Sequence, residues 1–416
     1  MRVGVAAVLL YDVEMFRAAM TLVSVLVFMA GPVVAAEDQE PPDPQPAAPA
    51  KKSRLPRDIK VDQGGGLHFT KHFAVVFGGI KQGSSIAVGP AVSWTFDNGA
   101  YLQIKGGFSV RQFKLVQLRY DSRPFFNARS LISTRLRWQD APQLPLFQPG
   151  PDSPNRHLTI SMTKTEWSAF LRTRVAPRTV VSAGSGVEGY SSEGKWADLA
   201  EAVARLGEPP VAPGLATRPW YVRSFATASY DTRFSPDYSR TGQMVEAGAY
   251  HYHDVPGATQ SFQRFEFAAL KLLPTFRVRE VPPSATPPAQ YRGALSVFGR
   301  AWLSHTGAGQ EVPIYLQTYL GGGDYLRGYS SYRFHDRNAV LVGTEYRYAI
   351  HKLIDAAVLL EAGTVAPTPS AFSLDEMAGS AAVGVRVHSK KTGLLRLDLA
   401  HGRDGFKFAI GMSVGS

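Results

Sequence analysis

Apolar and polar residues alternate along most of the chain from about residue 67 to its end. In residues 405–415 the apolar side chains Phe406, Phe408 and Ile410 occupy every second position, with polar or small residues between them. A period of two places successive side chains on opposite faces of an extended strand. The pattern therefore predicts strands with one apolar and one polar face. Helical periodicity is nearly confined to residues 191–218, where we expect a single surface helix.

Sixteen segments carry the alternating pattern. An even number suits a bacterial barrel whose two chain ends lie in the periplasm, and closure satisfies the backbone polar groups in lipid. We therefore expect an all-β fold, a 16-stranded antiparallel transmembrane β-barrel, rather than a soluble β-sandwich, which seldom has so many strands without a domain break. The predicted strands are residues 67–78, 84–96, 100–109, 112–121, 129–139, 156–176, 178–190, 219–232, 242–253, 260–273, 290–304, 338–349, 353–364, 379–388, 393–400 and 405–415.

The connections between these strands differ in length in the way that a barrel requires. If the first strand runs outward, the tight-turn sequence Asp97-Asn98-Gly99 falls on the periplasmic side. Short periplasmic turns and longer extracellular loops are typical of outer-membrane barrels. The proline-rich segment 274–289 is long and still falls on the periplasmic side. The long connections that fall outside are residues 140–155, 191–218, 305–337 and 365–378.

The first 66 residues are predicted to be targeting and linker sequence. The apolar run 20–30 follows Arg17 and precedes the small residues Val34-Ala35-Ala36, which is the anatomy of a secretory signal peptide. We expect a signal peptide at residues 1–36, with translation starting at Met1 or Met15. Residues 37–66 are rich in proline and charge and predict a periplasmic linker, which leaves residues 67–416 for the barrel and the outer membrane as its location.

Composition narrows the functional classes. The chain has no cysteine, which excludes disulfide and thiol chemistry. Its formal charge is +11, but the 45 lysines and arginines are spread over strand-like segments. A nucleic-acid partner would require a basic patch, so none is expected. The hydrophobic fraction of 44% suits a barrel that is apolar outside and polar inside.

One segment departs from simple alternation and is the main candidate for function. It reads Leu320-Gly321-Gly322-Gly323-Asp324-Tyr325-Leu326-Arg327-Gly328-Tyr329 and is followed by Arg333-Phe334. An arginine between glycine-rich turns, just ahead of a strand, predicts an extracellular loop folded inward against the barrel wall. The glycines let the backbone approach that wall closely.

These residues resemble the outer-membrane protein assembly factor superfamily, also called the bacterial surface antigen family, of sixteen-stranded barrels. The resemblance is specific from about Leu320 to Gly405 and weaker over residues 67–319. Family members usually carry periplasmic domains, and about thirty residues ahead of the first strand leave no room for them here. Further matching residues are Pro149-Gly150-Pro151-Asp152-Ser153, Arg337-Asn338-Ala339, Glu345-Tyr346-Arg347-Tyr348, Leu360-Glu361-Ala362-Gly363 and Leu395-Arg396-Leu397-Asp398-Leu399-Ala400.

The resemblance implies a role for the arginine of the motif. In the family, that arginine lies at the tip of the inward loop and pairs with an acidic residue on a later strand. Carried over, the motif Arg327, Gly328 and Tyr329 locks the loop, with Glu361 as the partner and Asp398 as a second candidate. Strand phase agrees, because the apolar positions from Ile354 to Leu360 form one face and leave Glu361 on the other. A bidentate bond between guanidinium and carboxylate would anchor the loop.

The resemblance also implies an activity. We expect a monomeric barrel, held in outer-membrane lipid, that inserts or translocates other polypeptides through the seam between strands 67–78 and 405–415. Client outer-membrane proteins, or a separate periplasmic partner, are the expected partners. The chain ends Met412-Ser413-Val414-Gly415-Ser416 rather than with an aromatic residue, which is consistent with a weakly paired last strand.

Two other functions stay open. A passive pore or structural surface barrel would keep the fold without this activity, and the missing periplasmic domains favour it. An enzyme would need a site, and the best candidate is a metal bound by His251 and His253 near Asp254. Two histidines are a weak signal, and neither a nucleophile motif nor a phosphate-binding loop is present. We therefore expect no enzyme, no cofactor and no metal.

Overall fold

The computed structural model describes residues 60–61, 66–192, 213–214, 218–235, 238–257, 259–278, 290–388 and 393–411. The expected signal peptide, most of the expected linker and the expected helix lie outside these ranges. Within them, the short strand β1 (Lys60–Val61) lies in the segment expected to be linker, and it pairs with β2 (Gly66–His68).

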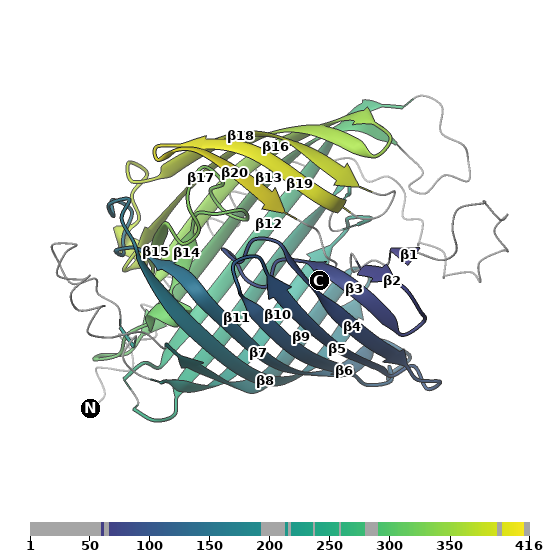
Figure 1. Ribbon diagram of the computed structural model, residues 1–416, viewed down its shortest axis with the longest axis horizontal. Helices are drawn as coiled ribbons and strands as arrows, with labels where there is room; N and C mark the ends of the chain where they lie inside the picture. The colour runs from purple at the N-terminus through teal and green to yellow at the C-terminus, as the bar shows by residue number, and fades with distance from the viewer. Residues whose placement is uncertain are drawn as a thin grey trace.

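The fold is a single barrel of antiparallel strands (Figure 1). Its sheet has 18 strands, and setting aside the short β1 and β2 leaves 16, so the sixteen-stranded barrel is confirmed. The barrel strands are β3 (Phe73–Gly78), β4 (Ala87–Thr95), β5 (Tyr101–Ser109), β6 (Lys114–Asp121), β7 (Ser130–Leu146), β8 (Leu158–Ala176), β9 (Thr179–Ser191), β10 (Trp220–Asp231), β11 (Gly242–Asp254), β12 (Phe262–Arg277), β13 (Tyr291–Thr306), β16 (Asn338–His351), β17 (Ile354–Ala366), β18 (Ala378–His388), β19 (Gly393–Gly402) and β20 (Gly405–Gly411).

Burial follows the predicted two-residue period. On β17 the side chains of Val358 and Leu360 are exposed on the outer face, whereas Leu359 and Glu361 are buried on the inner face. On β20 the outer face carries the phenylalanines predicted from the sequence. Apolar side chains therefore face lipid, and charged side chains face the lumen. No helix in the described ranges combines the length and apolarity that a membrane-spanning helix needs.

Several segments expected to be connections contain strand; β12, for example, runs to Arg277, inside the proline-rich segment 274–289. β7 continues to Leu146 instead of ending near residue 139, with a register shift between Ala141 and Leu144. Ala141, Leu144 and Leu146 are buried, and this apolar burial carries the strand beyond the lipid-facing part. Between β13 and β16 the chain forms the short 3₁₀ helix Ile314–Leu316 and a two-stranded hairpin, β14 (Thr318–Leu320) with β15 (Phe334–Asp336).

The barrel is nearly closed rather than fully hydrogen-bonded. Each barrel strand pairs with its neighbours in the chain, and β3 also pairs with the short β2 over three residues; no ladder of the described residues joins β20 to β2 or β3. Figure 1 shows the yellow C-terminal strands and the purple N-terminal strands on the two sides of this seam. Strands at an unpaired seam keep free backbone donors and acceptors.

The lipid-facing assignment can be tested on one strand. Ala226 lies on the exposed outer face at the middle of β10, and its neighbour Thr227 lies on the inner face. We expect Ala226→Arg to lower the free energy of unfolding by about 2–4 kcal/mol, because it places a charge in the bilayer midplane. Thr227→Arg is the matched control and should have little effect, since the lumen is polar. Denaturant titration of the barrel in liposomes measures both, and equal losses would contradict the assignment.

Candidate functional site

The loop between β13 and β16 folds into the barrel and forms the centre of the site. Its turn begins at Gly321 and Gly322, whose φ angles of 104° and 109° lie in the left-handed region that favours glycine. A side chain at Gly322 would collide with Gln82 and Ser331. We call residues 318–336 the luminal loop, because both ends are joined by the β14–β15 pairing.

Apolar residues of the luminal loop anchor it to the barrel wall. Leu320, Leu326 and Phe334 are fully buried, and Tyr329 is nearly so. Each such side chain contributes roughly 1.5–3 kcal/mol when it leaves water. This burial offsets part of the conformational entropy lost by ordering a long loop. Their partners on the strands are Ala339, Leu341, Val365 and Ala378.

The backbone of the motif binds the inner wall directly. The Arg327 N–H donates to Oε2 of Glu361 at 3.0 Å, and the Gly328 N–H donates to Oγ of Ser380 at 2.8 Å. The Tyr329 hydroxyl donates to the carbonyl oxygen of Gly379 at 3.0 Å. Three consecutive residues of the loop are therefore fixed to β17 and β18.

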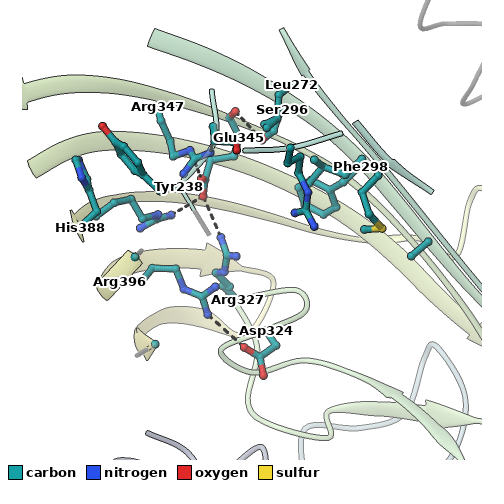
Figure 2. Close-up of a pocket in the computed structure, with 18 of the residues that line it drawn as sticks. Tyr238, Leu272, Ser296, Phe298, Asp324, Arg327, Glu345, Arg347, His388 and Arg396 are labelled. Carbon is teal, nitrogen blue, oxygen red and sulfur yellow. Dashed lines mark hydrogen bonds and ion pairs between the residues drawn. The ribbon is translucent and has the colours of Figure 1, made fainter. Parts of the chain in front are cut away.

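Arg327 is only 8% exposed, and its side chain points toward Glu345 (Figure 2). Its Nε lies 3.6 Å from Oδ2 of Asp398, and its Nη1 lies 3.6 Å from Oε2 of Glu345. The structure thus brings Arg327, Glu361 and Asp398 together. The expected bidentate pair with Glu361 is absent, because Glu361 accepts the backbone N–H while the guanidinium lies between the other two carboxylates.

Arg386 makes the short charged contacts that had been expected of Arg327. From β18, its Nη1 lies 2.5 Å from Oδ1 of Asp398 and its Nη2 lies 2.6 Å from Oε2 of Glu345. Arg386 was not predicted as a site residue, and Glu345 was quoted only as part of the resemblance. Strand phase puts Glu345 on the inner face of β16, but no pattern in the sequence names its partner.

A second arginine of the luminal loop is buried more deeply. Arg333 is 2% exposed, and its Nε donates to Oδ2 of Asp404 at 2.6 Å. Its two other nitrogens donate to Oγ and to the carbonyl oxygen of Ser153, at 2.7 and 2.8 Å. Arg333 therefore ties the loop to the β19–β20 turn and to the β7–β8 loop, since Ser153 belongs to the segment Pro149–Ser153.

The luminal loop also contacts the other side of the seam. The Gln82 side-chain amide, in the β3–β4 connection, donates to the carbonyl oxygen of Gly321. The Tyr332 hydroxyl donates to the carbonyl oxygen of Gln82 at 3.1 Å. A cavity of about 690 Å³ lies here, lined by residues 78–86 and by residues 407–411 of β20. The loop thus joins the C-terminal strands to the N-terminal strands where the sheet itself does not.

Lys81, in the same β3–β4 connection, lacks a carboxylate partner in the described chain. Its Nζ lies 3.8 Å from Sδ of Met162 and 5.7 Å from the centre of the Tyr332 ring. Burial, helped by the nearby charges of Lys164 and Arg137, lowers the pKa of Lys81 to about 7. Burial likewise lowers the pKa of His335 in β15.

A second cavity of about 480 Å³ lies on the inner side of the motif (Figure 2). Arginines dominate its charged lining, which includes Arg327, Arg347, Arg386 and Arg396. Most of these guanidiniums contact Glu345 or Asp398 within 4 Å. The cavity wall is therefore a network of paired charges rather than a free cationic surface.

The histidine pair considered for a metal site does not converge on one point. His251 and His253 are exposed on the outer face of β11, whereas Asp254 is buried on the inner face. The Asp254 carboxylate accepts the backbone N–H groups of Thr259 and Gln260. Within the described ranges, no group of three or more histidine, cysteine or acidic side chains could hold a metal ion.

The close approach of Gly328 to the wall gives a prediction about loop docking. A Cβ at Gly328 would lie 2.6 Å from backbone atoms of His401 and Gly402. We expect Gly328→Ala to destabilise the docked loop by about 1–3 kcal/mol, because rigid backbone must shift. Protease cleavage of the loop in detergent measures this. Gly379→Ala is the control, since a Cβ there meets nothing within 4 Å; equal protection of both variants would contradict the docking.

Comparison with known proteins agrees with this geometry. Residues 96–414 match the family model described as the Omp85 superfamily domain. The structure of BamA from Haemophilus ducreyi lacking POTRA domains 1–3 matches this one with a TM-score of 0.56 and 14% sequence identity. The match covers 82% of this chain and 69% of that chain. CdiB from Escherichia coli matches with a TM-score of 0.52 and 11% sequence identity, and the match covers 83% of this chain and 62% of that chain. No curated protein sequence gives a significant match.

Identities this low show a shared fold, whereas the family match spans most of the sequence. It covers the seam strand β20 and the whole luminal loop. The resemblance inferred from the motif is therefore confirmed. The chain belongs to the Omp85 superfamily and is an outer-membrane β-barrel.

Proposed function

We propose that this barrel inserts or translocates outer-membrane polypeptides, and that a client strand enters at the seam between β3 and β20. The observation that carries the proposal is the seam itself. Every other pair of neighbouring barrel strands forms a ladder. At the seam, the described part of β20 pairs only with β19, and the edge of β3 pairs only with the short strand β2, over three residues. An unpaired edge is a template for the addition of a further strand.

The luminal loop is the element that would control this edge. Arg327 and Gly328 hold the loop to β17 and β18, and Gln82 holds it to the connection after β3. Opening the seam separates these two groups of contacts, so the loop has to release one of them. The partners in this proposal are outer-membrane lipid, client outer-membrane proteins, and a separate periplasmic protein that delivers them to a monomeric barrel.

The first test is the insertion of an unfolded client barrel into liposomes. Liposomes that hold the protein should accelerate insertion relative to empty ones. Arg327→Ala should slow it roughly tenfold, which corresponds to about 1.4 kcal/mol of a lost charge-assisted contact. Arg292→Ala, at an exposed position near the start of β13, is the control and should behave as the native protein does. No acceleration by well-folded native protein would contradict the proposal and favour a passive pore or structural barrel.

A reversible cross-link tests the seam directly. An ideal Cβ at Gly83 lies 3.5 Å from Cβ of Ser331, within the spacing of about 3.5–4.5 Å found in disulfides. The chain has no other cysteine, so Gly83→Cys with Ser331→Cys introduces one possible pair. We expect the oxidised form to insert clients slowly and a reductant to restore the rate.

The reduced form of the same variant is the control for that cross-link. The φ of Gly83 is +82°, so a cysteine there is strained by about 1–2 kcal/mol in both redox states. The single variants Gly83→Cys and Ser331→Cys should not respond to reductant. Equal insertion rates before and after reduction would show that the seam need not open beside the luminal loop.

A further inference from the structure

The inner wall formed by β5, β6 and β7 carries a group of basic side chains. Lys105 and Arg137 are both cross-strand partners of Gln117, and Arg135 lies two residues from Arg137 on the same strand. Gln117 is buried on the inner face, while Ile104, Val116 and Leu136 are exposed on the outer face. Lys105, Arg135 and Arg137 therefore face the lumen together, and we call these three residues the cationic wall.

The residues of the cationic wall have no ion-pair partner within the described chain. No carboxylate lies within 4.0 Å of any of their nitrogens, and Arg137 donates only to the carbonyl oxygen of Ile80. Two other luminal cations, on β8 and β10, are paired. Lys164 contacts Glu166 and Glu188 at 3.0 Å, and Arg223 contacts the same two carboxylates. Glu166 lies opposite Arg137 in the β7–β8 ladder, but it already contacts Lys164 and Arg223, so the balance of charge at the cationic wall stays positive.

Two atoms of the cationic wall are both buried and unsatisfied. The Nε atoms of Arg135 and Arg137 are inaccessible to solvent and have no hydrogen-bond partner among the described residues. An unsatisfied buried donor on a charged group costs more than 1–3 kcal/mol. The side chains themselves remain partly exposed to the lumen, so a ligand that carries carboxylates can reach the guanidiniums. Low-dielectric walls concentrate the field of such a cluster.

We propose that the cationic wall binds the carboxylates of an extended, acidic polypeptide segment inside the barrel. Side chains on one face of an extended chain repeat every ~6.8 Å, which is also the spacing of Arg135 and Arg137 along β7. Lys105 lies on β5, two strands from β7 and therefore ~10 Å from Arg137 across the sheet. The site is therefore wider than a single strand. A segment with acidic residues at alternate positions therefore matches both the charge and the spacing of the wall.

This inference rests on the proposed function, which supplies the route by which a polypeptide reaches the lumen. It adds to that function the chemical class of the polypeptide segment that binds there. The wall begins at β5, two strands from the β3 edge of the seam. A binding assay in detergent requires no insertion. Its failure is therefore distinguishable from the failure of the liposome assay.

The test is fluorescence anisotropy of a labelled peptide of alternating glutamate and serine, mixed with the detergent-solubilised native barrel. Binding should be strong at about 0.01 M ionic strength and should weaken markedly at about 0.15 M, because salt screens charges. The triple variant K105Q/R135Q/R137Q should bind about tenfold more weakly, as three exposed ion pairs are lost. The variant R156Q/R218Q/R292Q removes the same charge from exposed positions outside the wall and should bind like the native protein.

Fold is checked by heat-dependent mobility on gels. If the triple variant does not fold, Arg135→Gln alone is tested. This change removes a side chain that forms no hydrogen bond or ion pair with the described residues, and it should weaken binding about twofold to threefold. The same peptide with glutamine for glutamate should not bind, and acetate at the same carboxylate concentration should not displace the acidic peptide. Absence of binding by the native barrel, equal weakening in both triple variants, or displacement by acetate would overturn the proposal.

Discussion

Buried carboxylates on the inner wall of β16, β17 and β19 are the constraint on which the site depends. Asp398 is 1% exposed, and moving such a charge out of water costs several kcal/mol unless it is paired. Two arginines pair with Asp398: Arg386 contacts it from the barrel strand β18, and Arg327 contacts it from the luminal loop. Removing either arginine weakens the compensation of Asp398, which Arg396 also contacts, so the wall and the loop stabilise one another.

The same arrangement explains how the barrel tolerates an incomplete seam. A transmembrane sheet is stable because every backbone group finds a partner within it, and β3 and β20 do not provide this for each other in the described residues. Side-chain contacts of the luminal loop replace part of the missing ladder near the outer end. Such contacts, unlike a ladder of backbone hydrogen bonds, can be released by the movement of one loop.

Much of this could be read from the sequence, and the misses share a physical cause. Alternation located all sixteen barrel strands, and strand phase put Glu361 and Asp398 on the inner face. Strand phase assigns a side chain to a face but does not name its partner. For this reason Arg386 was missed, and Glu361 and Asp398 were left as alternative partners of Arg327. The contact between Gln82 and Gly321 joins residues 239 positions apart, and no local pattern predicts it. β7 exceeded its predicted length because packing above the lipid, rather than alternation, determines where it ends.

Pairing separates two roles for the basic residues of the lumen. Cations such as Arg327, Arg386 and Arg223 contact carboxylates of the same chain and are therefore already neutralised. Their interactions stabilise the barrel and attract no external anion over a distance. Arg135 and Lys105 have no such partner in the described part of the chain, so their charge acts on a ligand that enters the lumen. The paired arginines fix the luminal loop and so define a closed state of the barrel. The unpaired basic residues would then form a surface that can hold an acidic chain after the seam has opened.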